Sequence, residues 1–112
     1  VQKQYKLSYL PIFYDDLLKA INYITLKLKN ERAAEELINL TEMVIRERLN
    51  APESFEKYQS MKERKYPYYR IYVKNYIIFY VVIPDKIDSS IATMEIRRFI
   101  YNRRDFKNYN KR

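Results

Sequence analysis

The stretch that decides the fold is "YYRIYVKNYIIFYVVI", residues 68–83. Its first six residues alternate between two faces, with Tyr69, Ile71 and Val73 on one and Arg70 and Tyr72 on the other, as in a half-buried strand. The last eight residues are apolar on both faces, which is typical of a central strand. Between them, Lys74 and Asn75 predict a two-residue hairpin turn, with Asn75 in the left-handed conformation that glycine would otherwise supply. The stretch therefore predicts an antiparallel hairpin at the centre of a sheet.

Two further strands are expected outside this hairpin. Residues 84–88, "PDKID", predict a turn, and residues 90–101, "SIATMEIRRFIY", predict the last long strand. Its alternation places Ala92, Met94, Ile96, Arg98 and Ile100 on one face, and Thr93, Glu95, Arg97, Phe99 and Tyr101 on the other. Residues 5–9, "YKLSY", alternate in the same way and predict a half-buried first strand.

Two amphipathic helices are expected between the first strand and the hairpin. Pro11 suits the first turn of a helix whose apolar stripe is Phe13, Leu17, Ile21, Ile24 and Leu28. Asp15 and Asp16 are expected to interact favourably with the positive end of its dipole. Asn30 predicts the N-cap of a second helix that ends before Pro52. The stripe of this helix is Ala34, Ile38, Thr41, Ile45 and Leu49, flanked by Ala33, Leu37, Leu40 and Val44.

The expected order is strand, helix, helix and a three-stranded meander. Because a helical pair must bury its apolar stripe against another layer, we expect a helical hairpin packed on a twisted antiparallel sheet, a β-α-α-β-β-β arrangement of the α+β class. The 112 residues, 47% of them hydrophobic, predict one domain over 1–112, since domains commonly hold roughly 100–150 residues.

Composition excludes several kinds of chemistry. The chain has no cysteine, histidine or glycine, so we expect no disulfide framework, no Ser-His-Asp or Cys-His mechanism and no glycine-rich phosphate loop. A structural zinc site is excluded for the same reason, and no metal or cofactor is expected. No apolar stretch approaches the ~20 residues that cross a bilayer, and the first residues show no signal-peptide pattern. We therefore expect a cytoplasmic protein without a membrane partner.

Positive charge is concentrated in the second half of the chain. Residues 1–50 hold eight Lys and Arg against seven Asp and Glu, whereas residues 51–112 hold fourteen against seven. The stretch "RRFIYNRRDF", residues 97–106, interleaves arginines with aromatic side chains. Such asymmetry indicates either an anionic partner, which would be nucleic acid, an acidic protein or an anionic membrane surface, or a surface that is charged only for solubility.

Four segments in this order resemble the RelE/ParE superfamily, the toxins of bacterial type II toxin–antitoxin systems. They are "YKLSYLPIFYDDLLKAINYI" at 5–24, "NERAAEELI" at 30–38, "YRIYVKNYIIFYVV" at 69–82 and "IRRFIYNRRDF" at 96–106. The resemblance implies a helical hairpin on an antiparallel sheet, a growth-inhibiting activity and an acidic antitoxin as partner. RelE-like members cleave mRNA in the ribosomal A site with basic residues and a tyrosine. ParE-like members instead inhibit DNA gyrase and lack that catalytic set.

The resemblance also implies site residues. Arg103 or Arg104 stands where the family has an arginine after the last strand, and Tyr109 lies near its C-terminal tyrosine, so these three are the candidate catalytic residues. Arg70, Lys74, Arg97 and Arg98 are the candidate nucleic-acid-binding or target-binding residues. We expect Arg70, Lys74, Arg103 and Arg104 to share one cationic concavity. The sequence departs from the RelE pattern at Ile77, where the family has an arginine in the central strand.

Cleavage of RNA through the 2′-hydroxyl needs a proton acceptor, cations for the charged phosphorane and an acid for the leaving oxygen. Arginine suits the second task because its planar fork contacts two phosphate oxygens.

Each candidate has a structural alternative. Arg97 and Arg98 should point to opposite sheet faces, so one of them would pair with a helix carboxylate such as Glu42 or Glu47. Glu95 would pair with an arginine. Arg103, Arg104 and Lys107 would form a solvated C-terminal segment, and the tyrosines, which are Tyr66, Tyr68, Tyr69, Tyr72 and Tyr76, would be sheet residues rather than base-stacking ones.

Three functions follow. The favoured one is a ribosome-dependent mRNA endonuclease, the alternative is a non-enzymatic gyrase inhibitor, and the third is a nucleic-acid-binding module without toxicity.

Overall fold

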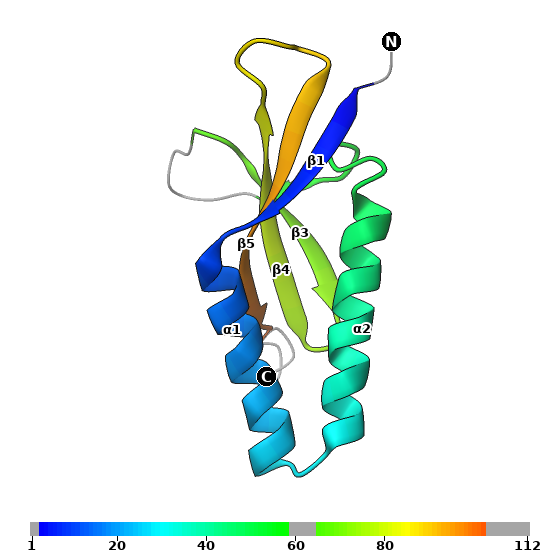
Figure 1. Ribbon diagram of the computed structural model, residues 1–112, viewed down its shortest axis with the longest axis vertical. Coiled ribbons are helices and arrows are strands. Elements are labelled where there is room, and N and C mark those ends of the chain that lie inside the picture. The colour runs from blue at the N-terminus through cyan, green and yellow to red at the C-terminus, as the bar shows by residue number, and fades with distance from the viewer. Residues whose placement is uncertain (1–2, 59–64, 103–112) are drawn as a thin grey trace, which may run out of the picture.

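The computed structural model describes residues 3–58 and 65–102. Its elements are β1 (Gln4–Tyr9), α1 (Pro11–Asn22), a π-helical turn η1 (Tyr23–Lys27), α2 (Glu31–Arg48), β2 (Lys57–Tyr58), β3 (Tyr68–Val73), β4 (Tyr76–Pro84) and β5 (Ile91–Tyr101). The two helices extend side by side, and the strands fan out above and between them (Figure 1). This confirms the α+β class and the helical hairpin on a sheet.

The sheet has five strands in the order β1-β5-β4-β3-β2. Three of its pairings are antiparallel, but β1 runs parallel to β5, with Gln4 opposite Ile91 and Tyr9 opposite Ile96. The two-residue strand β2 was not expected, because it is too short to show a periodicity. As predicted, β4 is the central strand, with Ile78, Tyr80 and Val81 fully buried.

The hairpin turn between β3 and β4 has two residues, with Val73 paired to Tyr76. The residue in the left-handed conformation is Lys74, with φ 52°, and not Asn75 as predicted. Both turn types that match the twist of a two-residue hairpin need a positive φ at the first central position, and Lys74 occupies that position.

A bulge in strand β5 interrupts the alternation of its side chains between the two faces of the sheet. Tyr80 pairs with Ile96 and Phe79 with Arg98, so Arg97 is the extra residue. A bulge breaks the alternation of faces, and Phe99 therefore lies on the core side with Ile96, at 3% exposure. The prediction that Phe99 shares a face with Glu95 was wrong for this reason.

The core lies between the helices and one face of the sheet. Its buried hydrophobic residues are Phe13, Ala20, Ile24, Ala34, Leu37, Ile45, Tyr69, Ile71, Val73, Ile78, Tyr80, Val82, Ala92, Met94, Ile96 and Phe99. Two predicted stripe residues are exposed instead. Leu28 follows the π-helical turn, whose extra residue rotates it off the stripe, and Ile38 stands beside the buried row of Ala34, Leu37, Thr41 and Ile45.

Helix α2 begins and ends where the sequence predicts. The side-chain oxygen of Asn30 accepts a hydrogen bond from the backbone N–H of Ala33 at 3.0 Å, which confirms the N-cap. Lys29 precedes it with φ 53°. At the other end, α2 stops at Arg48, before the buried Pro52.

The start of α1 differs from the expectation in one respect. Its first turn holds no acidic residue, because Asp15 and Asp16 lie beyond it. The dipole field falls off within the first turn, so these carboxylates have little to gain from it. Asp16 has another role, at the edge of β5.

Candidate cation and aromatic surface

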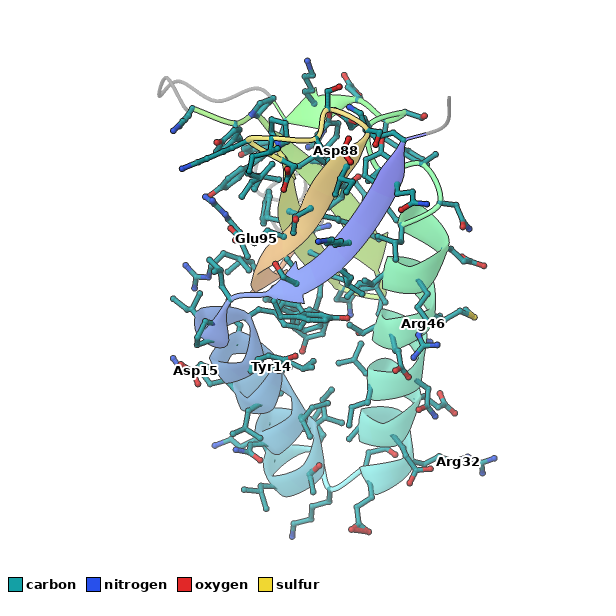
Figure 2. All side chains as sticks on the ribbon, turned by 45° about the horizontal axis from the view of Figure 1, so that its top comes forward. Tyr14, Asp15, Arg32, Arg46, Asp88 and Glu95 are labelled. Carbon is teal, nitrogen blue, oxygen red and sulfur yellow. The ribbon has the colours of Figure 1, made fainter. Side chains whose placement is uncertain are left out.

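The face of the sheet that turns away from the helices carries an array of aromatic and charged side chains. We call this array the open face and define it by Tyr58, Tyr68, Arg70, Tyr72, Phe79, Glu95 and Arg97. These side chains come from β2, β3, β4 and β5, which lie next to one another in the sheet. Figure 2 shows Glu95 among the strands, above the helix that carries Tyr14 and Asp15.

Arg70 lies between two tyrosine rings. Its guanidinium carbon is 4.8 Å from the ring centroid of Tyr58 and 5.7 Å from that of Tyr72. The two rings are themselves partly exposed, at 38% and 44%. Within residues 3–58 and 65–102, no carboxylate forms an ion pair with Arg70. The tyrosine rings therefore hold the Arg70 guanidinium in place but do not compensate its positive charge.

The array continues from Arg70 toward β5. The ring of Tyr58 lies 5.4 Å from that of Phe79, which lies 6.0 Å from Tyr68. The guanidinium carbon of Arg97 then lies 5.8 Å from the Tyr68 ring. Arginine and aromatic side chains thus form one continuous layer across four strands.

Arg97 is bound more firmly than Arg70. Its Nε donates to the carboxylate of Glu95 at 2.8 Å, and both side chains are mostly buried. Burial disfavours the charged form, but hydrogen bonds to Tyr68 and Glu95 outweigh this and raise the pKa of Arg97. Glu95 thus pairs with an arginine, as predicted. Within the array, the positive charge of Arg97 is compensated by Glu95, whereas no described carboxylate forms an ion pair with Arg70.

The backbone of Arg70 is fixed from below by Arg48. Strand β2 begins opposite Tyr69, so β3 has no partner from β2 at Arg70, and the carbonyl of Arg70 accepts a hydrogen bond from the Arg48 guanidinium at 3.0 Å. The same nitrogen donates to the Tyr80 hydroxyl at 2.9 Å, which in turn donates to the carbonyl of Pro52 at 2.7 Å. Phe55 stacks on Arg48, with 3.5 Å between guanidinium carbon and ring centroid. Arg48 is therefore a positioning residue that sequence reasoning missed.

Arg98 is not part of this surface. Its Nε and Nη2 donate to Asp16 at 2.7 and 3.0 Å, and the backbone N–H of Phe99 donates to the same carboxylate at 3.0 Å. A pairing with a helix carboxylate was predicted for Arg97 or Arg98, but with Glu42 or Glu47. Both of those lie on α2, whereas β5 runs beside α1.

Burial disfavours ionisation of Asp16, but these hydrogen bonds outweigh it and lower the pKa of its carboxyl. Hydrogen bonding to Asp16 likewise raises the pKa of Arg98.

Lys74 also lies apart from Arg70. It lines a hollow of about 350 Å³ with Glu36, Asn39, Leu40 and Met43 of α2, on the helical side of the sheet. The structure therefore does not gather Arg70 and Lys74 into one concavity, and that prediction was wrong for this pair. Arg103, Arg104 and Tyr109 lie outside the described residues.

The tyrosines divide between the two faces. Tyr68 and Tyr72 belong to the open face, whereas Tyr69 stacks on Tyr80 and Tyr76 on Phe99 in the core. Tyr66 lies 5.5 Å from the ammonium group of Lys65. Sequence reasoning missed Tyr58 and Phe79, because neither lies in a segment whose alternation identifies an open face.

No group of three or more acidic side chains is placed to hold a metal ion in the described part of the chain. None of the helices in that part is long and apolar enough to span a membrane. No model of a known protein family matches the chain, and no curated protein sequence matches it either. The relationship to RelE/ParE toxins therefore stays a prediction.

Proposed function

We propose that this chain is the toxin of a type II toxin–antitoxin pair of the RelE/ParE kind, and that it inhibits growth by cutting mRNA on the ribosome. The observation that carries the proposal is Arg70, an arginine without a carboxylate partner in the described residues, held between Tyr58 and Tyr72 on an open sheet face. The element order that the resemblance implies, a helical hairpin followed by a meander, supports it.

The open face offers two kinds of contact to a single RNA strand. The fork of Arg70 can donate two hydrogen bonds to one phosphate group. The exposed rings of Tyr58 and Tyr72 present surfaces on which unpaired bases stack. Together these contacts hold a strand in place by its backbone and its bases.

The cleavage step needs further groups. The 2′-oxygen attacks the adjacent phosphorus after losing its proton, and the 5′-oxygen leaves after gaining one. Arg103, Arg104 and Tyr109 are the residues that the resemblance offers for charge stabilisation and proton transfer. In this proposal Arg70 holds the strand and the C-terminal residues act on it.

An acidic antitoxin is the partner that this charge distribution favours. Residues 51–112 carry twice as many basic as acidic side chains. An acidic, partly disordered segment that folds on such a surface would pair its charges and cover the exposed rings. Binding of the antitoxin would then block access of RNA to Arg70.

One observation favours a second candidate function, inhibition of DNA gyrase. Ile77 lies opposite Tyr72 in the central strand, where the RelE pattern has an arginine. An isoleucine there removes a phosphate contact and leaves an apolar side chain that is suited to a protein surface. In that case the open face would bind gyrase without any covalent step.

The test measures mRNA integrity in a translating extract to which purified protein is added. We expect the wild-type protein to cut mRNA, and Arg70→Ala to slow cutting at least tenfold because the phosphate contact is lost. Arg70→Lys keeps the charge but not the fork and should lie in between. Lys86→Ala removes one positive charge from the exposed turn between β4 and β5 and should leave the rate unchanged.

Other results would decide against the proposal. Intact mRNA together with loss of gyrase supercoiling would establish the second candidate. Intact mRNA, normal supercoiling and normal growth on expression would reject both. Arg103→Ala and Arg104→Ala address the cleavage step itself and should abolish cutting while leaving RNA binding in place.

A further inference from the structure

Strand β1 is an uncovered edge of the sheet. It is hydrogen-bonded to β5 alone and has no strand on its other side within the described residues (Figure 2, front). The backbone N–H of Gln4 donates to Ser90 and that of Leu10 donates to Ile96, so the even-numbered residues face β5. The N–H and C=O groups of Tyr5, Leu7 and Tyr9 therefore point away from the sheet.

Of the devices that normally protect an edge strand, this one carries a single charged residue and no other. Among Gln4–Tyr9 there is no proline and no bulge, and Lys6 is the only charged residue. The opposite edge of the sheet, β2, is only two residues long. A six-residue edge with one lysine keeps most of its backbone groups open to pairing with another strand.

We propose that β1 pairs antiparallel with β1 of a second copy of this chain, about a two-fold axis at Leu7. Such pairing is self-complementary in hydrogen bonds. In an antiparallel ladder every second residue exchanges both its backbone hydrogen bonds with the residue opposite. An axis at Leu7 places Leu7 opposite itself and Tyr5 opposite Tyr9, so all three outward-facing residues are satisfied.

The side chains fit the same arrangement. On the helical side, Tyr5 of each copy meets Tyr9 of the other, an aromatic pair of the kind that stabilises antiparallel ladders. Both rings are already held in place. The Tyr5 hydroxyl donates to Glu53 at 2.7 Å, and the Tyr9 ring lies 5.4 Å from the rings of Phe13 and Tyr14. Tyr14 is 54% exposed and extends this apolar surface onto α1.

Charge does not oppose pairing with a second copy. Lys6 is the one charged residue of Gln4–Tyr9. On the other side of the sheet, Lys6 lies opposite Ser8 of the second copy, so no like charges are directly opposed. This proposal goes beyond the toxin function and does not depend on it.

The test measures the mass of the purified chain by light scattering and sedimentation over a concentration series. We expect the mass of a dimer that dissociates on dilution. Ser8→Lys places a second lysine opposite Lys6 twice in each dimer and should raise the dissociation constant by about tenfold. Adding Lys6→Glu to Ser8→Lys turns both repulsions into attractions and should restore the dimer. Asn39→Lys adds the same charge on the exposed side of α2 and serves as the control.

Amide hydrogen exchange provides a second measurement that does not depend on any variant. The N–H groups of Lys6 and Ser8 face β5 and should be protected in monomer and dimer alike. Those of Leu7 and Tyr9 should become protected only as the concentration rises. A single-copy mass at every concentration would overturn the proposal. So would protection of Leu7 and Tyr9 by an added acidic peptide while the chain itself stays monomeric.

Discussion

The contact between Asp16 and Arg98 joins α1 to the sheet, and its removal gives the most informative prediction. Strand β1 ends at Tyr9, opposite Ile96, so β5 has no strand on that side beyond this point. Asp16 fills the gap by accepting hydrogen bonds from the Phe99 backbone and from the Arg98 side chain, 82 residues away in sequence. We expect α1 to lose much of its hold on β5 when this carboxylate is removed.

The magnitude follows from exposure and geometry. The Asp16 side chain is only 9% exposed, whereas that of Arg98 is 41% exposed. Removal of Asp16 leaves the Phe99 N–H without its partner, which costs about 1–3 kcal/mol, while the Arg98 guanidinium can recover hydration. We therefore expect Asp16→Ala to lower the free energy of unfolding by about 2–3 kcal/mol, near the upper end of common single substitutions.

A double-mutant cycle isolates the pair itself. The free energy of unfolding is measured by urea titration, followed by circular dichroism, for Asp16→Ala, Arg98→Ala and the double variant. We expect a coupling of about 1–2 kcal/mol, since the pair is bidentate and half shielded from water. The matched control is Glu42 with Arg46, a pair of similar length at 3.1 Å whose side chains are 60% and 73% exposed. Its coupling should be about 0.3–0.5 kcal/mol.

The pair also predicts a dependence on pH. The pKa of Asp16 is lowered in the folded protein from its ordinary value of 3.8. Its contribution is therefore complete above pH 3.8 and is lost as the pH falls through the lower, folded-state value. The stability difference between the wild type and Asp16→Asn should shrink over that acidic range. A coupling no larger than that of the control, or a difference unchanged in acid, would refute this account of how α1 is attached.

Four further predictions concern single residues, and urea titration measures the first three. Asn30→Ala should destabilise the protein by about 1 kcal/mol through loss of the N-cap of α2, whereas Asn30→Ser should cost little. Thr41→Val should stabilise it by up to about 1 kcal/mol, since the buried Thr41 hydroxyl has no hydrogen-bond partner among the described residues. Lys74→Gly should stabilise it by about 1 kcal/mol because glycine adopts φ 52° without a steric penalty. Burial and the Glu53 carboxylate raise the pKa of Tyr5 to about 12, so its contribution persists below pH 10 and is lost as the pH rises through about 12. A tyrosine absorbance titration should therefore lose amplitude near pH 12 in Tyr5→Phe; an unchanged amplitude there would contradict this.

Much of the fold follows from local patterns. The alternation in residues 68–73 and the two-sided apolar run after it identify β3 and β4 because burial of one or both faces requires those patterns. Asn30 identifies the start of α2 because its side chain bonds within the same turn. Such features depend on residues close together in the sequence.

The candidate site was only partly predictable. Arg70 could be assigned to the solvent side of β3, since its neighbours in alternation are apolar. Its flanking ring at Tyr58 could not, because a strand of two residues carries no periodic signal. The family resemblance grouped Lys74 with Arg70, but the turn places Lys74 on the helical side of the sheet.

What the sequence alone determined is therefore the class of fold, the order and type of its elements and the charge asymmetry of the two halves. The tertiary structure decided the parallel pairing of β1, the bulge at Arg97 and the partners of the arginines. Two consecutive arginines of β5 show the difference. Arg97 binds Glu95, two residues away in the sequence, whereas Arg98 binds Asp16, 82 residues away. Periodicity shows which side chains of one helix or strand share a face. Strand pairing and ion-pair partners depend instead on which elements lie side by side in the folded chain, and no local pattern shows that.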